Sequence, residues 1–219
     1  MGKMIFCAEL GSNHKGKESL AYEMIRKFSE AGATICKFQL GHNAGDPIRY
    51  VDHIAPKLKE WCDYFDVEFM ASIWTEEALD LSRKLGMKRY KVAHQLALDP
   101  EQKELVDKIV SDGKEVFMSG NIVPQENVRA IYVSPKYPTY LNDLDMPQKF
   151  TDGYWYGYSD HTHGIAAPLL AIARGARFVE VHCTLDKTEE SIRDNHFACS
   201  PAEFEQLVKL GTQIAKING

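Results

Sequence analysis

Eight short apolar runs, separated by amphipathic stretches, constrain the fold of this chain more than any other feature. The runs are rich in β-branched and aromatic residues, and each has the length of a strand. A strand followed by a helix, repeated eight times, is the pattern of a parallel (β/α)8 barrel, and we predict this α/β (TIM barrel) fold. The predicted strands are residues 4–10, 34–40, 68–73, 89–94, 115–120, 129–134, 153–159 and 178–184.

The connections between the runs indicate which helices the barrel has. LAYEMIRKFSEAG, EEALDLSRKLG and KELVDKIVSDG carry apolar residues at three- and four-residue spacing and have a Gly near their ends. NIVPQENV, after the fifth run, is too short for a full helix, and the Pro-rich sixth connection is typical of a loop. We therefore expect reduced or missing helices after strands 5 and 6, and a last helix over 201–217. Residues 1–219 would form this single domain.

Composition argues against several classes of partner. The net charge is −5 and Lys and Arg are scattered among Asp and Glu, so no basic stripe points to nucleic acid. No apolar run approaches the roughly 18 residues that span a bilayer, and the N-terminal segment does not resemble a secretion signal. The five cysteines lack CxxC spacing, so we expect them to be reduced. These features predict a cytoplasmic protein that binds neither nucleic acid nor membrane.

Polar side chains gather where the predicted strands end, which is where barrels of this type carry their active sites. Lys37 and Lys91 lie near the ends of the second and fourth strands. A buried ammonium group is costly there unless an anion neutralises it, and hydroxyl groups beside it suit a phosphate. The sequence therefore predicts a bound phosphate, with hydroxyl groups from Ser72, Ser119 and Ser159.

Two histidines, His161 and His182, lie at the ends of the seventh and eighth strands. Adjacent parallel strands lie about 4.8 Å apart, so imidazoles at the same level can share one metal ion. With oxygen ligands from water, substrate or a carboxylate such as Glu9, a divalent ion there would act as a Lewis acid on a carbonyl. We predict a divalent metal, Mn2+ in the first place, with Mg2+, Fe2+, Co2+ and Zn2+ left open.

Eight motifs in the same order resemble those of the N-acetylneuraminate (sialic acid) synthase family and its bacterial nonulosonate relatives. They are AELGSNHKG, CKFQ, RYKVA, MSG, KYPT, GYSDHTHG, VEVHCTLD and DNHFACSPAEF. The resemblance implies a (β/α)8 transferase that condenses phosphoenolpyruvate with an N-acetylhexosamine aldehyde and releases phosphate, with the help of a divalent metal. The small-molecule partners would be phosphoenolpyruvate and an amino-sugar aldehyde of the N-acetylmannosamine type, and the product a sialic-type acid of carbohydrate biosynthesis.

The resemblance also implies roles for single residues. His161 and His182 match the metal ligands, and Glu9 matches an acid near the reacting carbon. Gln39 and Tyr137 would face the sugar. Phosphoenolpyruvate would lie among Lys37, Ser72, Lys91, Ser119 and Ser159. The expected catalytic residues are Glu9, Lys37, Lys91, His161 and His182.

Three departures from the family pattern affect the sugar site. After Lys91 the chain has AHQL, which puts His94 near a phosphate-binding Ser position and Leu96 near a sugar-contacting acid. RDNH replaces a GPDH-like element, so either Asp194 or Asn195 takes the place of its acid. The family's C-terminal antifreeze-like domain is not expected after the barrel. We include His94 and Asp194 among the substrate-binding residues.

Two other functions stay open at this point. Lys37 or Lys91 could form a Schiff base in an aldolase, although the paired histidines would then have no evident role. A barrel with missing helices could also bind a sugar or phosphate without turnover.

The missing helices also lead to an expectation about assembly. Strand residues that lose their usual cover would form an exposed apolar patch, and such patches are association surfaces. We therefore expect a homo-oligomer that associates through Val116, Met118, Ile131 and Val133.

Overall fold

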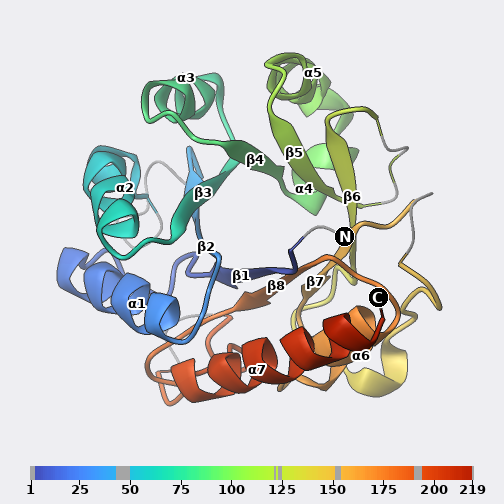
Figure 1. Ribbon diagram of the computed structural model, residues 1–219. Coiled ribbons are helices and arrows are strands. Elements are labelled where there is room, and N and C mark those ends of the chain that lie inside the picture. Colours follow the sequence, from blue (N-terminus) through green and yellow to red (C-terminus); the bar gives the residue numbers. More distant parts are fainter. Residues whose placement is uncertain are drawn as a thin grey trace.

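The eight strands close into one parallel barrel in the order of the sequence (Figure 1). The computed structural model describes residues 3–42, 50–120, 122, 125–150, 154–189 and 194–218. Each strand pairs with its neighbours along the chain, and β8 pairs with β1 to close the ring. The predicted fold is confirmed. The strands are β1 (Ile5–Glu9), β2 (Ile35–Leu40), β3 (Glu68–Ile73), β4 (Arg89–Val92), β5 (Glu115–Ser119), β6 (Val128–Val133), β7 (Gly157–Asp160) and β8 (Phe178–His182).

Helices surround much of the ring but leave part of it uncovered (Figure 1). In the described residues between β5 and β7, the only helical segment is a 3-10 turn at Leu141–Asp143. The prediction of missing helices after strands 5 and 6 is therefore confirmed. No helix in the described part of the chain is long and apolar enough to cross a membrane. The helices are α1 (Glu18–Glu30), α2 (Ala55–Tyr64), α3 (Glu76–Lys84), α4 (His94–Leu98), α5 (Lys103–Ser111), α6 (Ala166–Ala173) and α7 (Pro201–Ile217).

The last helix shows how the sequence sets local structure. Ser200 is the N-cap of α7: its hydroxyl accepts a hydrogen bond from the Glu203 backbone, and the Glu203 carboxylate accepts one from the Ser200 backbone. Pro201 follows at the first helical position, where its missing N–H costs nothing. Phe204 and Leu207 are buried against the barrel. α7 therefore begins and ends where the sequence predicts.

Several predicted strand boundaries were wrong, including the end of β8, which lies at His182 and not at residue 184. β7 begins at Gly157, not at residue 153, which lies outside the described residues. β4 ends at Val92, and His94 is the first residue of α4, not the last of a strand. Val92 forms the last pair with β5, and Ala93 extends the apolar run beyond it, so the run is longer than the strand.

The predicted exposed apolar patch does not exist. Val116, Met118, Ile131 and Val133 are each at most 9% exposed. The short helix α4 packs against β5 in place of a longer helix, and Val133 lines a cavity at the barrel mouth. This reason for expecting a homo-oligomer was wrong, and oligomerisation stays a prediction without that surface.

The strand register brings polar side chains to one level of the barrel interior. Residues two apart on a strand point to the same face, so one polar residue per strand end is enough to build a polar layer. Paired positions on neighbouring strands are Glu9 with Lys37, Glu9 with His182, Ser72 with Lys91 and Ser159 with Glu180.

Candidate active site

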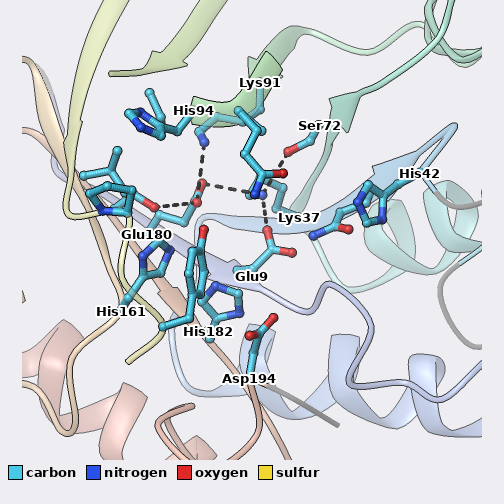
Figure 2. A pocket seen from close by; sticks show the side chains of 18 of the residues that line it. Glu9, Lys37, His42, Ser72, Lys91, His94, His161, Glu180, His182 and Asp194 are labelled. Carbon is cyan, nitrogen blue, oxygen red and sulfur yellow. Dashed lines mark hydrogen bonds and ion pairs between the residues drawn. The ribbon is translucent and has the colours of Figure 1, made fainter. Parts of the chain in front are cut away.

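A cavity of about 270 Å3 lies at the carboxyl ends of the strands (Figure 2). All eight strands, or the loops that follow them, contribute to its lining. Every residue predicted for the site lines this cavity: Glu9, Lys37, Gln39, Ser72, Lys91, His94, Ser119, Tyr137, Ser159, His161, His182 and Asp194. The lining residues that sequence reasoning did not assign to the site are Ser12, His42, Trp74, Ala93, Gln95, Val133, Pro135 and Glu180.

Four buried charged side chains form a continuous set of ion pairs in the cavity. Lys37 Nζ pairs with Glu9 and lies 3.7 Å from Glu180 Oε2. Lys91 Nζ lies 3.6 Å from Glu180 Oε1, so Glu180 lies between the two lysines (Figure 2). None of the four residues is more than 4% exposed. Because the charges alternate in sign, each buried ion has a counter-ion that offsets the cost of leaving water.

Serine hydroxyl groups accompany these charges. Ser72 Oγ accepts a hydrogen bond of 3.1 Å from Lys37 Nζ, and Ser159 Oγ donates one of 2.9 Å to Glu180 Oε1. Ser119 Oγ is buried without a hydrogen-bond partner among the described residues. Two of the three predicted hydroxyl groups thus belong to the ion-pair set, and the third is available to a ligand.

Burial and the ion pairs shift the pKa values of these groups. Burial raises the pKa of Glu9 to about 7, although the charge of Lys37 opposes this. Burial acts in the same direction on Glu180, but Lys37 and Lys91 outweigh it and lower the pKa of Glu180 to about 2. Burial lowers the pKa of Lys91, against the charge of Glu180. Burial also disfavours charged Lys37, but Glu180 and Glu9 raise its pKa overall.

Glu180 is the most important site residue that sequence reasoning missed. It lies in the apolar run FVEVHCT, which predicts a strand without a role for its acid. A signal was present, because Glu180 is two residues before His182 and must share its inward face. Glu180 and Glu9 supply part of the negative charge that the sequence analysis assigned to a bound phosphate.

His161 and His182 lie together at the cavity wall (Figure 2), with ring centroids 5.4 Å apart and planes inclined by 53°. His161 Nδ1 donates a hydrogen bond of 2.8 Å to the carbonyl oxygen of Ser134, which leaves Nε2 as the nitrogen available for a ligand. Burial and the neighbouring His182 lower the pKa of His161 to about 3, so its ring is neutral. Tyr137 packs against His161 with ring centroids 3.9 Å apart.

These residues fit a weakly held divalent ion. His161 is neutral, and its orientation is fixed by a backbone carbonyl, as is usual for metal-binding histidines. Asp194 points its carboxylate toward the same region as His182 (Figure 2). The described residues contain no group of three or more His, Cys, Asp or Glu side chains arranged to hold a metal. Water or substrate would therefore complete the coordination.

Comparison with known proteins identifies the family. Residues 49–134 and 125–219 match the NeuB family, and together they make up more than half of the chain. The chain belongs to the NeuB family. It is 27% identical to N,N'-diacetyllegionaminic acid synthase of Campylobacter jejuni, over 100% of this chain and 78% of that protein. It is 26% identical to N-acetylneuraminate-9-phosphate synthase of Homo sapiens, over 92% of this chain and 67% of that protein.

A solved structure of a relative has the same architecture. The N-acetylneuraminic acid (sialic acid) synthetase of Leptospira borgpetersenii serovar Hardjo-bovis, in complex with citrate, matches with a TM-score of 0.86 and 26% identity. The match covers 100% of this chain and 86% of that chain. The synthases that resemble this chain are named for different acids, so the NeuB family is shown while the product is not.

The structure distinguishes the two candidates for the NeuB-type acid in RDNH. Asp194 lines the cavity. Asn195 is 1% exposed, and its side-chain amide donates to the carbonyl oxygens of Asp186 and Glu189. Asn195 therefore holds the loop after β8 together, and Asp194 is the residue that faces the cavity. Arg193 lies outside the described residues.

The segment after Lys91 reaches the cavity only in part. Leu96, which the resemblance puts near a sugar-contacting acid, is 4% exposed and belongs to the core of the barrel. His94 and Gln95 line the cavity instead. The contact that this acid would supply therefore has no counterpart at position 96.

The loop after β1 fixes the position of Glu9. Gly11 has a φ of +42°, and a Cβ there would lie 2.6 Å from Glu9 Oε1, so only glycine fits. The Asn13 amide donates a hydrogen bond of 2.7 Å to the carbonyl oxygen of Cys183, after β8. His14 is fully buried and accepts a hydrogen bond of 3.0 Å from the loop backbone through Nδ1. His14 thus supports the loop and is not among the residues that line the cavity.

Proposed function

We propose that this protein condenses phosphoenolpyruvate with an N-acetylhexosamine aldehyde of the N-acetylmannosamine type, giving a nonulosonic, sialic-type acid and phosphate. One observation carries the proposal: two buried lysines and two adjacent imidazoles line the same cavity. The two ammonium groups suit the phosphate and carboxylate of a phosphorylated enol acid. The two imidazoles suit a metal ion that would polarise an aldehyde. We place the reaction in the cytoplasm, in keeping with five free, buried cysteines.

Lys37 and Lys91 would hold the phosphate and carboxylate of phosphoenolpyruvate. Both ammonium groups are buried, so charge-assisted bonds to an anion are strong there. Glu9 and Glu180 neutralise them only in part, because Glu180 lies more than 3.5 Å from either lysine. Ser119 Oγ adds an unused donor at the same rim.

The carbonyl partner would lie toward the histidines. His161 and His182 would hold a divalent ion, which when bound supplies Lewis-acid polarisation of the aldehyde carbonyl. Gln39, Tyr137 and Asp194 line the cavity and would contact the sugar.

Glu9 would act near the reacting carbon. Its strand position is beside His182, and its carboxylate pairs with Lys37, so it lies between the two halves of the site. In the proposed reaction the enol carbon attacks the aldehyde, water adds to the resulting cation, and phosphate leaves with the oxygen that had bridged carbon and phosphorus. We assign to Glu9 the acid–base role in these steps.

Phosphate release from phosphoenolpyruvate tests the proposal. The protein is incubated with Mn2+ and a panel of N-acetylated hexosamines, with matched samples that lack the aldehyde or contain a chelator. Release that requires both the aldehyde and the metal supports the synthase. Phosphoenolpyruvate that binds without releasing phosphate for any aldehyde would favour a binding protein instead.

A Schiff-base aldolase is the second candidate, and one observation favours it. Burial lowers the pKa of Lys91, which makes its amine a better nucleophile. Reduction with borohydride in the presence of pyruvate would trap such an adduct as added mass on a lysine. We expect no adduct, because Glu180 keeps a negative charge beside the Lys91 ammonium group.

A further inference from the structure

Two buried polar atoms at one side of the cavity have no hydrogen-bond partner among the described residues. They are Ser119 Oγ, at the end of β5, and His94 Nδ1, at the start of α4. Leaving such buried atoms unpaired destabilises a protein. Two of them at the same side of one cavity indicate a ligand that would satisfy both.

His94 lies against the end of β5. Gly120 follows Ser119 with a φ of +124°, and a Cβ at position 120 would lie 3.1 Å from His94 Nδ1. A side chain at position 120 would crowd the imidazole and would be strained by this φ. The ring therefore lies against Gly120, the residue that follows Ser119.

Lys91 completes the cluster. It is three residues before His94, and Figure 2 shows both side chains at the same end of the cavity. Its nearest described charge partner is Glu180, whose Oε1 is 3.6 Å from Lys91 Nζ. Glu180 Oε2 is also within 3.7 Å of Lys37, so its charge is shared. The Lys91 ammonium group retains donors for a second anion.

We propose that a phosphate dianion held by Lys91 and Ser119 also binds His94 and draws a proton onto its imidazole. This inference rests on the proposed function, because it assumes a phosphorylated substrate. Burial and the charge of Lys91 lower the pKa of His94, so the imidazole is neutral without a ligand. A dianion beside it reverses the sign of the local field and favours imidazolium.

The charges around His94 are few. β4 presents Lys91 and β5 presents the uncharged Ser119, while Glu180 lies across the cavity on β8. α5, which also packs against α4, pairs its own charges on its exposed side. Glu9, whose pKa is about 7, also lines the cavity, so the proton uptake that belongs to His94 is the difference between the wild type and a His94 substitution.

Calorimetric titration with inorganic sulfate tests the subsite without any turnover. Sulfate remains a dianion through the neutral range, so it takes up no proton itself. Titrations at pH 7.5 in two buffers of different ionisation enthalpy give the number of protons bound per sulfate. We expect net uptake by the wild type, clearly less uptake by His94→Gln, and roughly tenfold weaker sulfate binding in that variant.

His163→Gln is the matched control, because His163 is exposed and its ring lies 5.7 Å from that of His196, outside the cavity lining. It should keep the wild-type proton uptake and affinity. His94→Asn serves as a second variant if His94→Gln folds poorly, which thermal unfolding will show. Equal proton uptake in wild type and both His94 variants, or no sulfate binding by the wild type, overturns the inference. A protein that fails to condense phosphoenolpyruvate but shows His94-dependent uptake refutes the synthase and retains the subsite.

Discussion

Glu180 offers the sharpest test of the buried ion pairs, because one oxygen of this carboxylate faces each lysine. Glu180→Gln keeps the size of the side chain and an acceptor for Ser159 while it removes the charge. Lys91 then loses its described counter-ion, and Lys37 retains Glu9. The variant should be less stable and should also bind anions more tightly, a combination that simple loss of packing does not produce.

The expected loss of stability follows from the burial of the site. Removal of one partner from a buried ion pair typically costs about 3–5 kcal/mol. The pKa of Glu180, lowered from 4.5 to about 2, corresponds independently to about 3 kcal/mol of favourable interaction with the charged form. We therefore expect the free energy of unfolding to fall by about 3 kcal/mol. Affinity for phosphoenolpyruvate should rise about tenfold, or about 1.4 kcal/mol, because a competing negative charge is gone.

Urea unfolding followed by tryptophan fluorescence measures the first effect, and calorimetry with phosphoenolpyruvate in the absence of metal measures the second. Glu77→Gln, an exposed carboxylate on α3, is the matched control and should change neither quantity by more than about 0.5 kcal/mol. If Glu180→Gln is as stable as wild type and binds phosphoenolpyruvate no better, the ion pairs described here do not operate in solution.

Three further predictions concern the metal, the anion and the last helix. His161→Ala or His182→Ala should abolish metal-dependent phosphate release while calorimetry still detects phosphoenolpyruvate binding; turnover that survives in either variant rules out a shared ion. Lys91→Met should weaken phosphoenolpyruvate binding by about 1.5–3 kcal/mol, and unchanged affinity removes Lys91 from the pocket. Ser200→Ala, which deletes the N-cap of α7, should lower the free energy of unfolding by about 1 kcal/mol in urea, whereas no change would show that this cap is dispensable.

Much of the fold could be predicted because each strand and helix has a local signature. The alternation of apolar runs and amphipathic stretches gave all eight strands, and Pro201 with Ile217 bounded the last helix. The errors arose where neighbours decide the outcome. β4 ends at Val92 because its pairing with β5 ends there, although the apolar run continues. The residues of the expected apolar patch are buried although the helices after β5 and β6 are missing. α4 packs against β5 and Val133 lines the cavity, and no local pattern revealed either contact.

The candidate site was predictable in membership but not in its charge balance. Polar residues at strand ends converge in any such barrel, so Lys37, Lys91 and the two histidines could be placed together. Glu180 was missed because a single acid inside an apolar run looks like part of the strand. The Asn195 amide donates hydrogen bonds to the carbonyl oxygens of Asp186 and Glu189, while Asp194 faces the cavity. The sequence does not show these hydrogen bonds, so it could not decide between the two residues.

The fate of one oxygen atom tests the central claim most directly. Phosphoenolpyruvate carrying 18O in the oxygen that bridges carbon and phosphorus is incubated with the protein, Mn2+ and the aldehyde that supports phosphate release. Mass spectrometry then locates the label. The proposed reaction predicts that all of the label leaves with phosphate and that a sugar acid without label forms, because the carbon–oxygen bond breaks. Label retained in the acid, or in pyruvate with no sugar acid formed, contradicts the proposed condensation.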